Sequence, residues 1–135
     1  MNQSTRTFAV AILAATTVTA PVLADQILTG SEAQNLLAGR RFEFNCIDGT
    51  SGLASYERSG LAKAIYRMPN MRETAMEVAD TGRVRSSGDN VCIRWQQLDS
   101  GQEGCYRMTQ YSPGRYRIAT SDQGRWCDLQ ERGTL

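Results

Sequence analysis

Turn-forming residues recur at short intervals from residue 40 to the end of the chain, and this recurrence restricts the folds that the chain can adopt. Strand-like runs separated by turns at a spacing of roughly 8–12 residues are typical of antiparallel barrels and sandwiches. We therefore expect a mainly β protein, a small antiparallel β-barrel or sandwich. The turns are Asp48-Gly49, Ser59-Gly60, Pro69-Asn70, Thr81-Gly82, Ser87-Gly88-Asp89-Asn90, Pro113-Gly114 and Gln123-Gly124.

These turns delimit nine expected strands, preceded by one short helix. Ser31 followed by Gln34 fits a capping box, and Gly39 fits a helix end, so we expect a helix at 32–38. The stretch 61–79 is ambiguous between strand and helix, because Ala, Met and Glu favour helices. The expected strands are 40–47, 51–58, 61–68, 72–79, 83–86, 91–97, 104–110, 115–120 and 125–130.

The first 24 residues predict an export signal. A polar start with Arg6 leads into an apolar run from Phe8 to Val18, and Val22 and Ala24 place small side chains before a cleavage point. This is the three-part pattern of a secretory signal peptide, with Asp25 as the first mature residue. The apolar run is too short to span ~30 Å of hydrocarbon. We expect a single domain over 25–135 in the periplasm or secreted, with no membrane span after cleavage.

Charge and composition exclude several functions. Arg6 is the one charged residue of the signal, so residues 25–135 carry 14 basic and 14 acidic groups. A neutral domain lacks the basic excess that phosphate neutralisation requires, which argues against nucleic-acid binding. The chain has no His, which removes Ser-His and Cys-His nucleophile pairs and His-ligated zinc.

Four cysteines in an exported domain of this size indicate two disulfides. The runs 91–97 and 104–108 form a hairpin in which Cys92 faces Cys105 and Arg94 faces Glu103. In this one register, the two cysteines lie opposite each other and so do the two opposite charges, and both pairs stabilise the hairpin. Its other face, a candidate core face, carries Val91, Ile93, Trp95, Tyr106 and Met108.

The remaining cysteines then pair with each other. In the last hairpin, a register that sets Arg117 opposite Asp128 also sets Cys127 opposite Ile118 on an apolar side. Cys46 shares the side of its strand with two phenylalanines of RFEFNC. We therefore expect a Cys46–Cys127 bond that ties the first strand of the series to the last.

No residue pattern indicates catalysis, a metal or a cofactor. The four cysteines lack the close pairs of a zinc site. A small barrel can hold one small ligand, and aromatic strand residues can line such a cavity or simply fill the core. The candidate binding residues are Trp95, Trp126, Tyr106 and Arg94.

Several segments resemble small exported alphaproteobacterial proteins of unknown function. The resemblance rests on FEFNCIDGT (42–50), YERSG (56–60), GRVRSSGDNVCIRW (82–95) and EGCYRM (103–108), and its motifs are structural. The stretch around Cys46-Ile-Asp-Gly-Thr is also similar to periplasmic inhibitors of c-type lysozyme, which are small disulfide-bonded β-barrels. The nearest match to their Ser-Ala-Ser-Gly motif is Ser86-Ser87-Gly88, which lacks the Ala and has no Tyr close behind it.

The sequence thus predicts a non-catalytic periplasmic binding or envelope-associated module. Its partner would be a protein or a small ligand that the sequence does not identify. A lysozyme inhibitor and a small hydrolase with carboxylate chemistry are the two alternatives.

Overall fold

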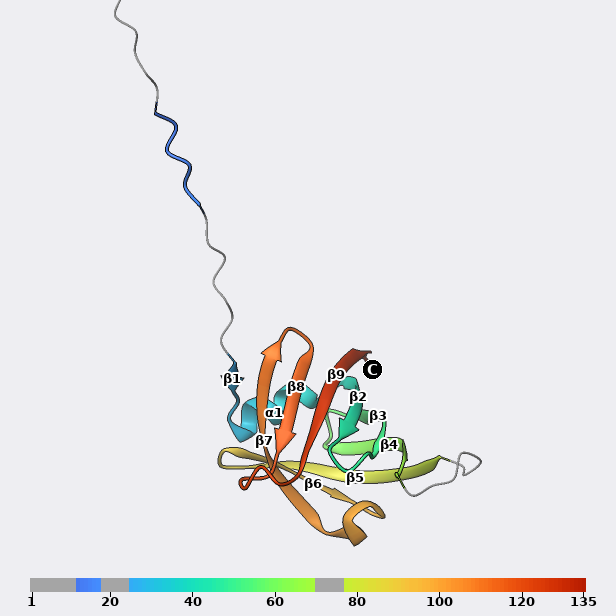
Figure 1. The fold of residues 1–135 in the computed structure, drawn as a ribbon. Coiled ribbons are helices and arrows are strands. Elements are labelled where there is room, and N and C mark those ends of the chain that lie inside the picture. The colour runs from blue at the N-terminus through green and yellow to red at the C-terminus, as the bar shows by residue number, and fades with distance from the viewer. Residues whose placement is uncertain (1–11, 18–24, 70–76) are drawn as a thin grey trace, which may run out of the picture.

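Eight antiparallel strands, each paired with the next, close into a barrel in the computed structural model, which describes residues 12–17, 25–69 and 77–135 (Figure 1). The last strand pairs with the first of the eight, so the meander has no open edge there. The expected mainly β fold with two disulfides is confirmed, as a barrel. The strands are β2 (Arg40–Cys46), β3 (Ser51–Tyr56), β4 (Leu61–Arg67), β5 (Val78–Ser87), β6 (Asn90–Trp95), β7 (Glu103–Ser112), β8 (Arg115–Ala119) and β9 (Trp126–Thr134).

The barrel closes between β2 and β9, and the Cys46–Cys127 disulfide joins directly opposed residues of that strand pair. The Cys92–Cys105 disulfide joins opposed residues of β6 and β7. Both expected bonds are confirmed. A disulfide stabilises chiefly by restricting the unfolded chain, and more so for a longer loop. The bond at the closure spans 81 residues against 13 for the other, so it constrains the unfolded state more.

The two predicted hairpin registers are confirmed residue by residue. Cys92 faces Cys105 between β6 and β7, and Arg117 faces and pairs with Asp128 between β8 and β9. The predicted ion pair of Arg94 with Glu103 is wrong, although these residues do lie opposite each other. Glu103 binds Arg85 on the neighbouring strand instead.

The single helix, α1 (Gly30–Leu37), begins two residues before the predicted position. Its capping box is formed by Thr29 and Glu32, whose side chains each accept a hydrogen bond from the other residue's backbone, so the predicted Ser31 cap is wrong. Gly39 follows the helix with φ of 77°, a conformation that glycine adopts without strain. A short strand, β1 (Gln26–Ile27), pairs with β7 and was not predicted.

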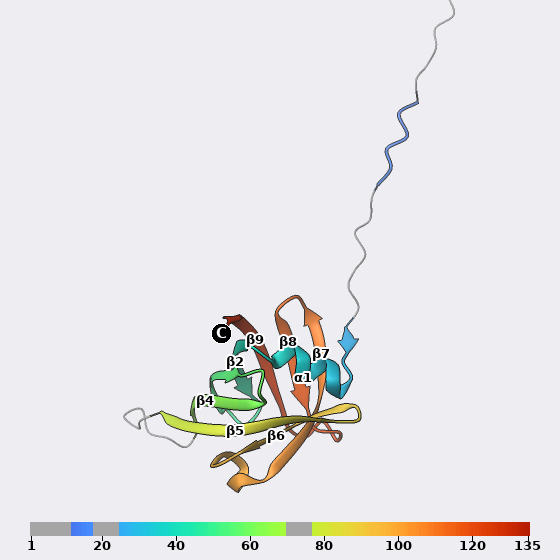
Figure 2. The same cartoon turned by 180° about the vertical axis from the view of Figure 1, so that it is seen from behind.

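Helix α1 lies across one end of the barrel (Figure 2). The amide of Gly30 donates to the Gly88 carbonyl in the β5–β6 turn, and the amide of Gly39 donates to Tyr56 at the end of β3. A Cβ on Gly30 would lie 2.3 Å from the Asn90 oxygen, so only glycine allows this approach. The buried side chains of Ala33 and Leu37 join the barrel core.

One predicted turn lies inside a strand. Thr81-Gly82 was expected to separate two strands, but β5 continues through it to Ser87. A Cβ on Gly82 would lie 2.8 Å from the ring of Trp95, so the absence of a side chain at Gly82 makes room for that ring. The predicted strand 72–79 falls partly on residues 70–76, outside the described residues, and within 61–79 the structure has strand at 61–67 and 78–79. No helix in the described ranges is long and apolar enough to cross a membrane.

The core face predicted for β6 and β7 is confirmed. Val91, Ile93 and Met108 are buried, and Trp95 and Tyr106 pack against them half-buried. The inner face of β3 to β5 combines the large side chains of Tyr56 and Tyr66 with several alanines and glycines. Ala54 faces Ala64, Tyr56 faces Ala62, and Ala62 in turn faces Gly82.

Gly52 on β3 provides a test of this close packing. It lies between Phe44 of β2 and Tyr66 of β4 in the sheet, and a Cβ there would lie 2.1 Å from the Ile65 oxygen. We expect Gly52→Ala to lower the free energy of unfolding by about 1–3 kcal/mol, the usual cost of overpacking. The measurement is urea unfolding, with Ser55→Ala on the outer side of β3 as the control. If Gly52→Ala proved as stable as Ser55→Ala, the prediction would be contradicted, because β4 would have moved to accept the added methyl group at no cost.

Candidate functional site

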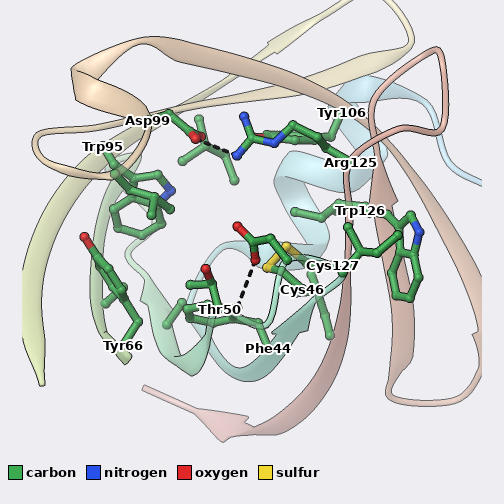
Figure 3. Close-up of a pocket in the computed structure, with 18 of the residues that line it drawn as sticks. Phe44, Cys46, Thr50, Tyr66, Trp95, Asp99, Tyr106, Arg125, Trp126 and Cys127 are labelled. Atoms are coloured by element: carbon green, nitrogen blue, oxygen red, sulfur yellow. Dashed lines mark hydrogen bonds and ion pairs between the residues drawn. A yellow bond between two sulfur atoms is a disulfide. The ribbon is translucent and has the colours of Figure 1, made fainter. Parts of the chain in front are cut away.

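A cavity of about 160 Å³ opens at the end of the barrel opposite α1 (Figure 3). It exists because the facing residues Ala54 and Ala64 leave the interior of β3 and β4 unfilled. An eight-stranded barrel is just wide enough for side chains to fill it, so small residues on two neighbouring strands leave room for one small molecule. For scale, an apolar cavity of about 150 Å³ holds one benzene molecule.

Apolar and aromatic side chains form most of the cavity wall. Figure 3 shows Tyr66 and Trp95 side by side on one wall, with Tyr106 and Arg125 along another. The Cys46–Cys127 disulfide contributes to the lining, so the bond that closes the barrel also borders the cavity. The apolar and aromatic lining residues are Phe44, Ile47, Ala54, Tyr56, Ala64, Tyr66, Ile93, Trp95, Leu98, Tyr106, Ile118, Trp126 and Leu129.

An ion pair crosses the rim of the cavity. Arg125, in the β8–β9 turn, donates to Asp99 at 2.5 Å, and Asp99 belongs to a short 3₁₀ turn, η1 (Leu98–Gly101). The hydrogen bond to Asp99 is the main cause that raises the pKa of Arg125, so the guanidinium stays charged. This pair holds together two loops that are far apart in the sequence.

The backbone of both rim loops is strained. Asp99 and Ser100 are consecutive non-glycine residues in the left-handed region, with φ of 55° and 56°, and Gln123 has φ of 61°. Each such residue stores about 1–3 kcal/mol and persists only where its surroundings hold it, which occurs often at ligand-binding sites. The surroundings here include the Asp99–Arg125 pair and the buried carboxylate of Asp80.

Asp80 anchors the η1 turn from inside the barrel. Its carboxylate is 5% exposed and accepts from the amides of Gln96, Gln97 and Leu98 at 2.9–3.2 Å. It also accepts from the hydroxyl of Tyr66 at 3.2 Å. One buried carboxylate therefore couples the rim loop to a tyrosine of the cavity wall.

The Tyr66 hydroxyl titrates abnormally because of this arrangement. Burial is the main cause that raises its pKa from 10.0 to about 12, followed by the charge of Asp80 and the hydrogen bond to it. Burial also raises the pKa of Tyr56 and of Tyr106. These phenols are neutral hydrogen-bonding groups at the cavity across the neutral pH range.

The structure places three of the four candidate binding residues in the cavity lining, namely Trp95, Tyr106 and Trp126. The ring of Trp126 points away from the middle of the cavity (Figure 3). The guanidinium of Arg117 lies 3.8 Å from the centre of this ring. Arg94 lies outside the lining, where it donates to the Gly101 carbonyl at 2.9 Å.

Two carboxylates line the cavity, and each has a partner. Asp48 accepts from the amide of Thr50 at 2.9 Å, and Asp99 binds Arg125. Sequence reasoning did not single out either residue as part of a site. It also missed Ala54, Ala64 and Asp80, although the alanines at alternate positions of ASY and LAKAIY were a sign of a narrow inner face.

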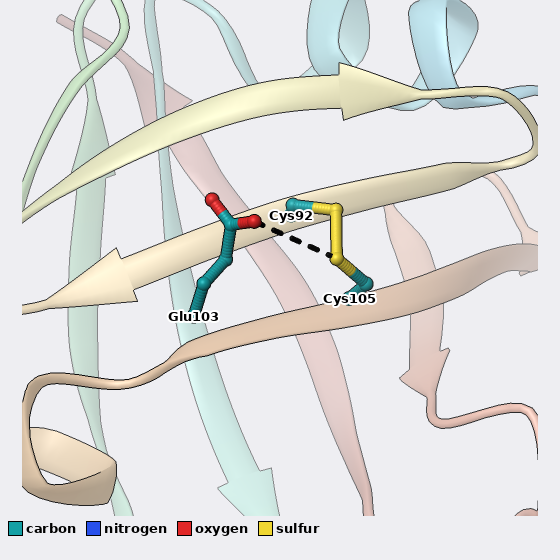
Figure 4. A group of neighbouring side chains, drawn as sticks. All are labelled: Cys92, Glu103 and Cys105. Carbon is teal, nitrogen blue, oxygen red and sulfur yellow. Dashed lines mark hydrogen bonds between the residues drawn. A yellow bond between two sulfur atoms is a disulfide. The ribbon is translucent and has the colours of Figure 1, made fainter.

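A second cluster lies on the outside of the barrel, where Glu103 approaches the Cys92–Cys105 disulfide (Figure 4). The Glu103 carboxylate is 3.9 Å from Cys105 Sγ. Both sulfurs are bonded to each other and carry no proton or thiolate charge, so this group offers a metal only one ordinary ligand. The Glu103 carboxylate is also already paired with Arg85.

The motif compared with lysozyme inhibitors lies at the opposite end of the barrel from the cavity. Ser86 and Ser87 end β5, and Gly88 in the following turn is bonded to Gly30 at the start of α1.

No family model, curated protein or solved structure matches the chain. The cavity is therefore interpreted from its own residues.

Asp80 and Tyr66 provide a test of the rim anchor. In the unfolded chain Tyr66 ionises near pH 10, but in the folded chain only near pH 12, so folding retains a proton that the unfolded chain loses. This contribution to stability is complete below pH 10 and is lost as the pH rises towards 12. In Asp80→Asn, we expect the phenol pKa to fall towards 10 and the free energy of unfolding to drop by about 2 kcal/mol.

Tyrosinate absorbance and urea unfolding between pH 8 and 12 measure both effects. Asp122→Asn, in the exposed β8–β9 turn, is the matched control. An unchanged titration in Asp80→Asn would contradict the coupling of Asp80 to Tyr66.

Proposed function

We propose that the protein is a non-catalytic periplasmic binding module that takes one small, mainly apolar molecule into the open end of its barrel. The observation that carries this proposal is the cavity of about 160 Å³ between Ala54, Ala64 and the aromatic wall. Ligand sites are typically concave and apolar with a few polar groups, which is the composition of this lining.

The location of the protein in the periplasm is also part of this proposal. Two disulfides are compatible with an oxidising compartment, and all four cysteines are bonded. The expected signal peptide and the resemblance to exported alphaproteobacterial proteins support the periplasm in particular. The chain would then act after removal of residues 1–24.

Binding is favoured over hydrolysis by the state of the cavity carboxylates. A carboxylate hydrolase needs a general acid whose pKa is raised and a second carboxylate free to act as base or nucleophile. Asp99 is instead held by Arg125, so Asp48 is, among the described residues, the one lining carboxylate without a cationic partner. One such carboxylate does not make the acid and base pair that hydrolysis needs.

The lysozyme-inhibitor alternative is less favoured, because its candidate segment, Ser86-Ser87-Gly88, is bonded to α1 through Gly88 rather than projecting freely. We expect c-type lysozyme to lyse cells at an unchanged rate in the presence of excess protein. A turbidity assay measures this, and inhibition at near-equal concentrations would replace the present proposal.

Tryptophan fluorescence tests the cavity as a binding site, because Trp95 lines it. We expect benzyl alcohol to change the emission in a saturable way, with a dissociation constant of roughly 0.1–1 mM for a ligand of this size. Ala64→Leu, which fills the cavity, should weaken binding at least tenfold while the fold is kept. Ser55→Ala on the outer face should bind normally, and equal binding by Ala64→Leu would place the site elsewhere.

A further inference from the structure

The charged groups of the cavity indicate which small molecules it would prefer. Among the residues that the structure describes, the charged ones that line it are Asp48, Asp99 and Arg125, two carboxylates and one guanidinium. This described part of the lining therefore has a formal charge of −1, although residues 25–135 as a whole are neutral. An unbalanced charge at the mouth of an apolar site attracts the opposite charge, less strongly where solvent screens it.

Arg125 already has an anionic partner in Asp99. Its guanidinium donates to Asp99 at 2.5 Å, and the side chain of Asp99 is only 20% exposed. An anionic ligand that took over this guanidinium would leave a largely buried carboxylate unpaired, which is costly. The same exchange would release the strained η1 turn that carries Asp99.

Asp48 is the carboxylate that keeps acceptor capacity. Its contact is a single hydrogen bond, from the Thr50 amide to Oδ1. Within the described residues, no cationic nitrogen lies within 4 Å of this carboxylate. The charge of Asp48 contributes to the raised pKa of Arg125, but less than Asp99 does. Asp48 thus supplies the unbalanced charge.

The wall beside these groups is aromatic. Tyr66, Trp95 and Tyr106 line the cavity, and Figure 3 shows the first two adjacent on one wall. Aromatic ring faces attract organic cations, including substituted ammonium groups, through the negative charge on the face of the ring. A carboxylate at the rim and several aromatic rings in the wall are the two elements of such a site.

We infer that the cavity selects a small organic cation, an amine or quaternary ammonium on an apolar body about the size of benzene, with Asp48 as the charge partner. This inference rests on the proposed function, because it names the ligand class of the same cavity. The apolar body would lie against Ala54 and Ala64, and the ammonium group would lie towards the rim. Arg125 and Asp99 would stay paired and would hold the rim loops in place.

Three probes of nearly equal size separate charge from shape: benzylamine, benzyl alcohol and benzoate. In the native chain at pH 7 and low salt, we expect benzylamine to bind about 3- to 10-fold more tightly than benzyl alcohol, and benzoate to bind most weakly. The preference is moderate because Asp48 is exposed and partly screened. It should shrink in 0.5 M NaCl, and benzyl alcohol binding should not change.

Asp48→Asn keeps the shape of the side chain and its acceptor for the Thr50 amide. In this variant we expect benzylamine to bind no more tightly than benzyl alcohol, whose own affinity stays the same. Asp122→Asn removes an exposed carboxylate outside the cavity lining and should retain the cation preference.

The outcomes separate the inference from the function on which it rests. If benzoate binds as tightly as benzylamine, or if Asp48→Asn keeps the preference, the inference is overturned and the cavity remains a binding site. If none of the three probes binds, the proposed function itself fails.

Discussion

The pairing of β2 with β9 is the contact on which the rest of the structure depends. Without it the chain would be an open, strongly twisted sheet with two unpaired edges and no enclosed interior. The contact joins residues 81 positions apart at the Cys46–Cys127 bond, so its formation carries the entropy cost of closing a long loop. The disulfide lies in that strand pair and also borders the cavity, which links the stability of the fold to the shape of the site.

A closed barrel of eight strands requires its interior to be filled, and the chain fills it unevenly. The α1 end is packed by the helix together with large side chains such as Phe42 and Met108, both fully buried. At the other end, Ala54 and Ala64 face each other and leave a space that the surrounding aromatic rings do not occupy. The free energy that such a space costs is tolerated, because the closed ladder and two disulfides stabilise the rest of the barrel.

Much of the fold could be predicted from the sequence, because strands carry strong local signals. Alternation and opposed charges defined the registers around Cys92–Cys105 and Arg117–Asp128, and elimination then paired Cys46 with Cys127. Gly82 was misinterpreted as a turn, because its reason is the ring of Trp95 on the next strand. The alternating alanines indicate small residues on an inner face, but the cavity and the Asp80 anchor depend on which residues lie next to them on other strands, which a local pattern does not give.

We propose that the space beside Ala54 and Ala64 is a binding site rather than a packing defect. Methyl NMR spectra of alanine-labelled protein during titration with benzylamine measure this most directly. We predict saturable shifts that are largest at the Ala54 and Ala64 methyl groups, with little change at Ala33 beneath α1. Shifts that do not saturate, or that are centred on other residues, would contradict the claim.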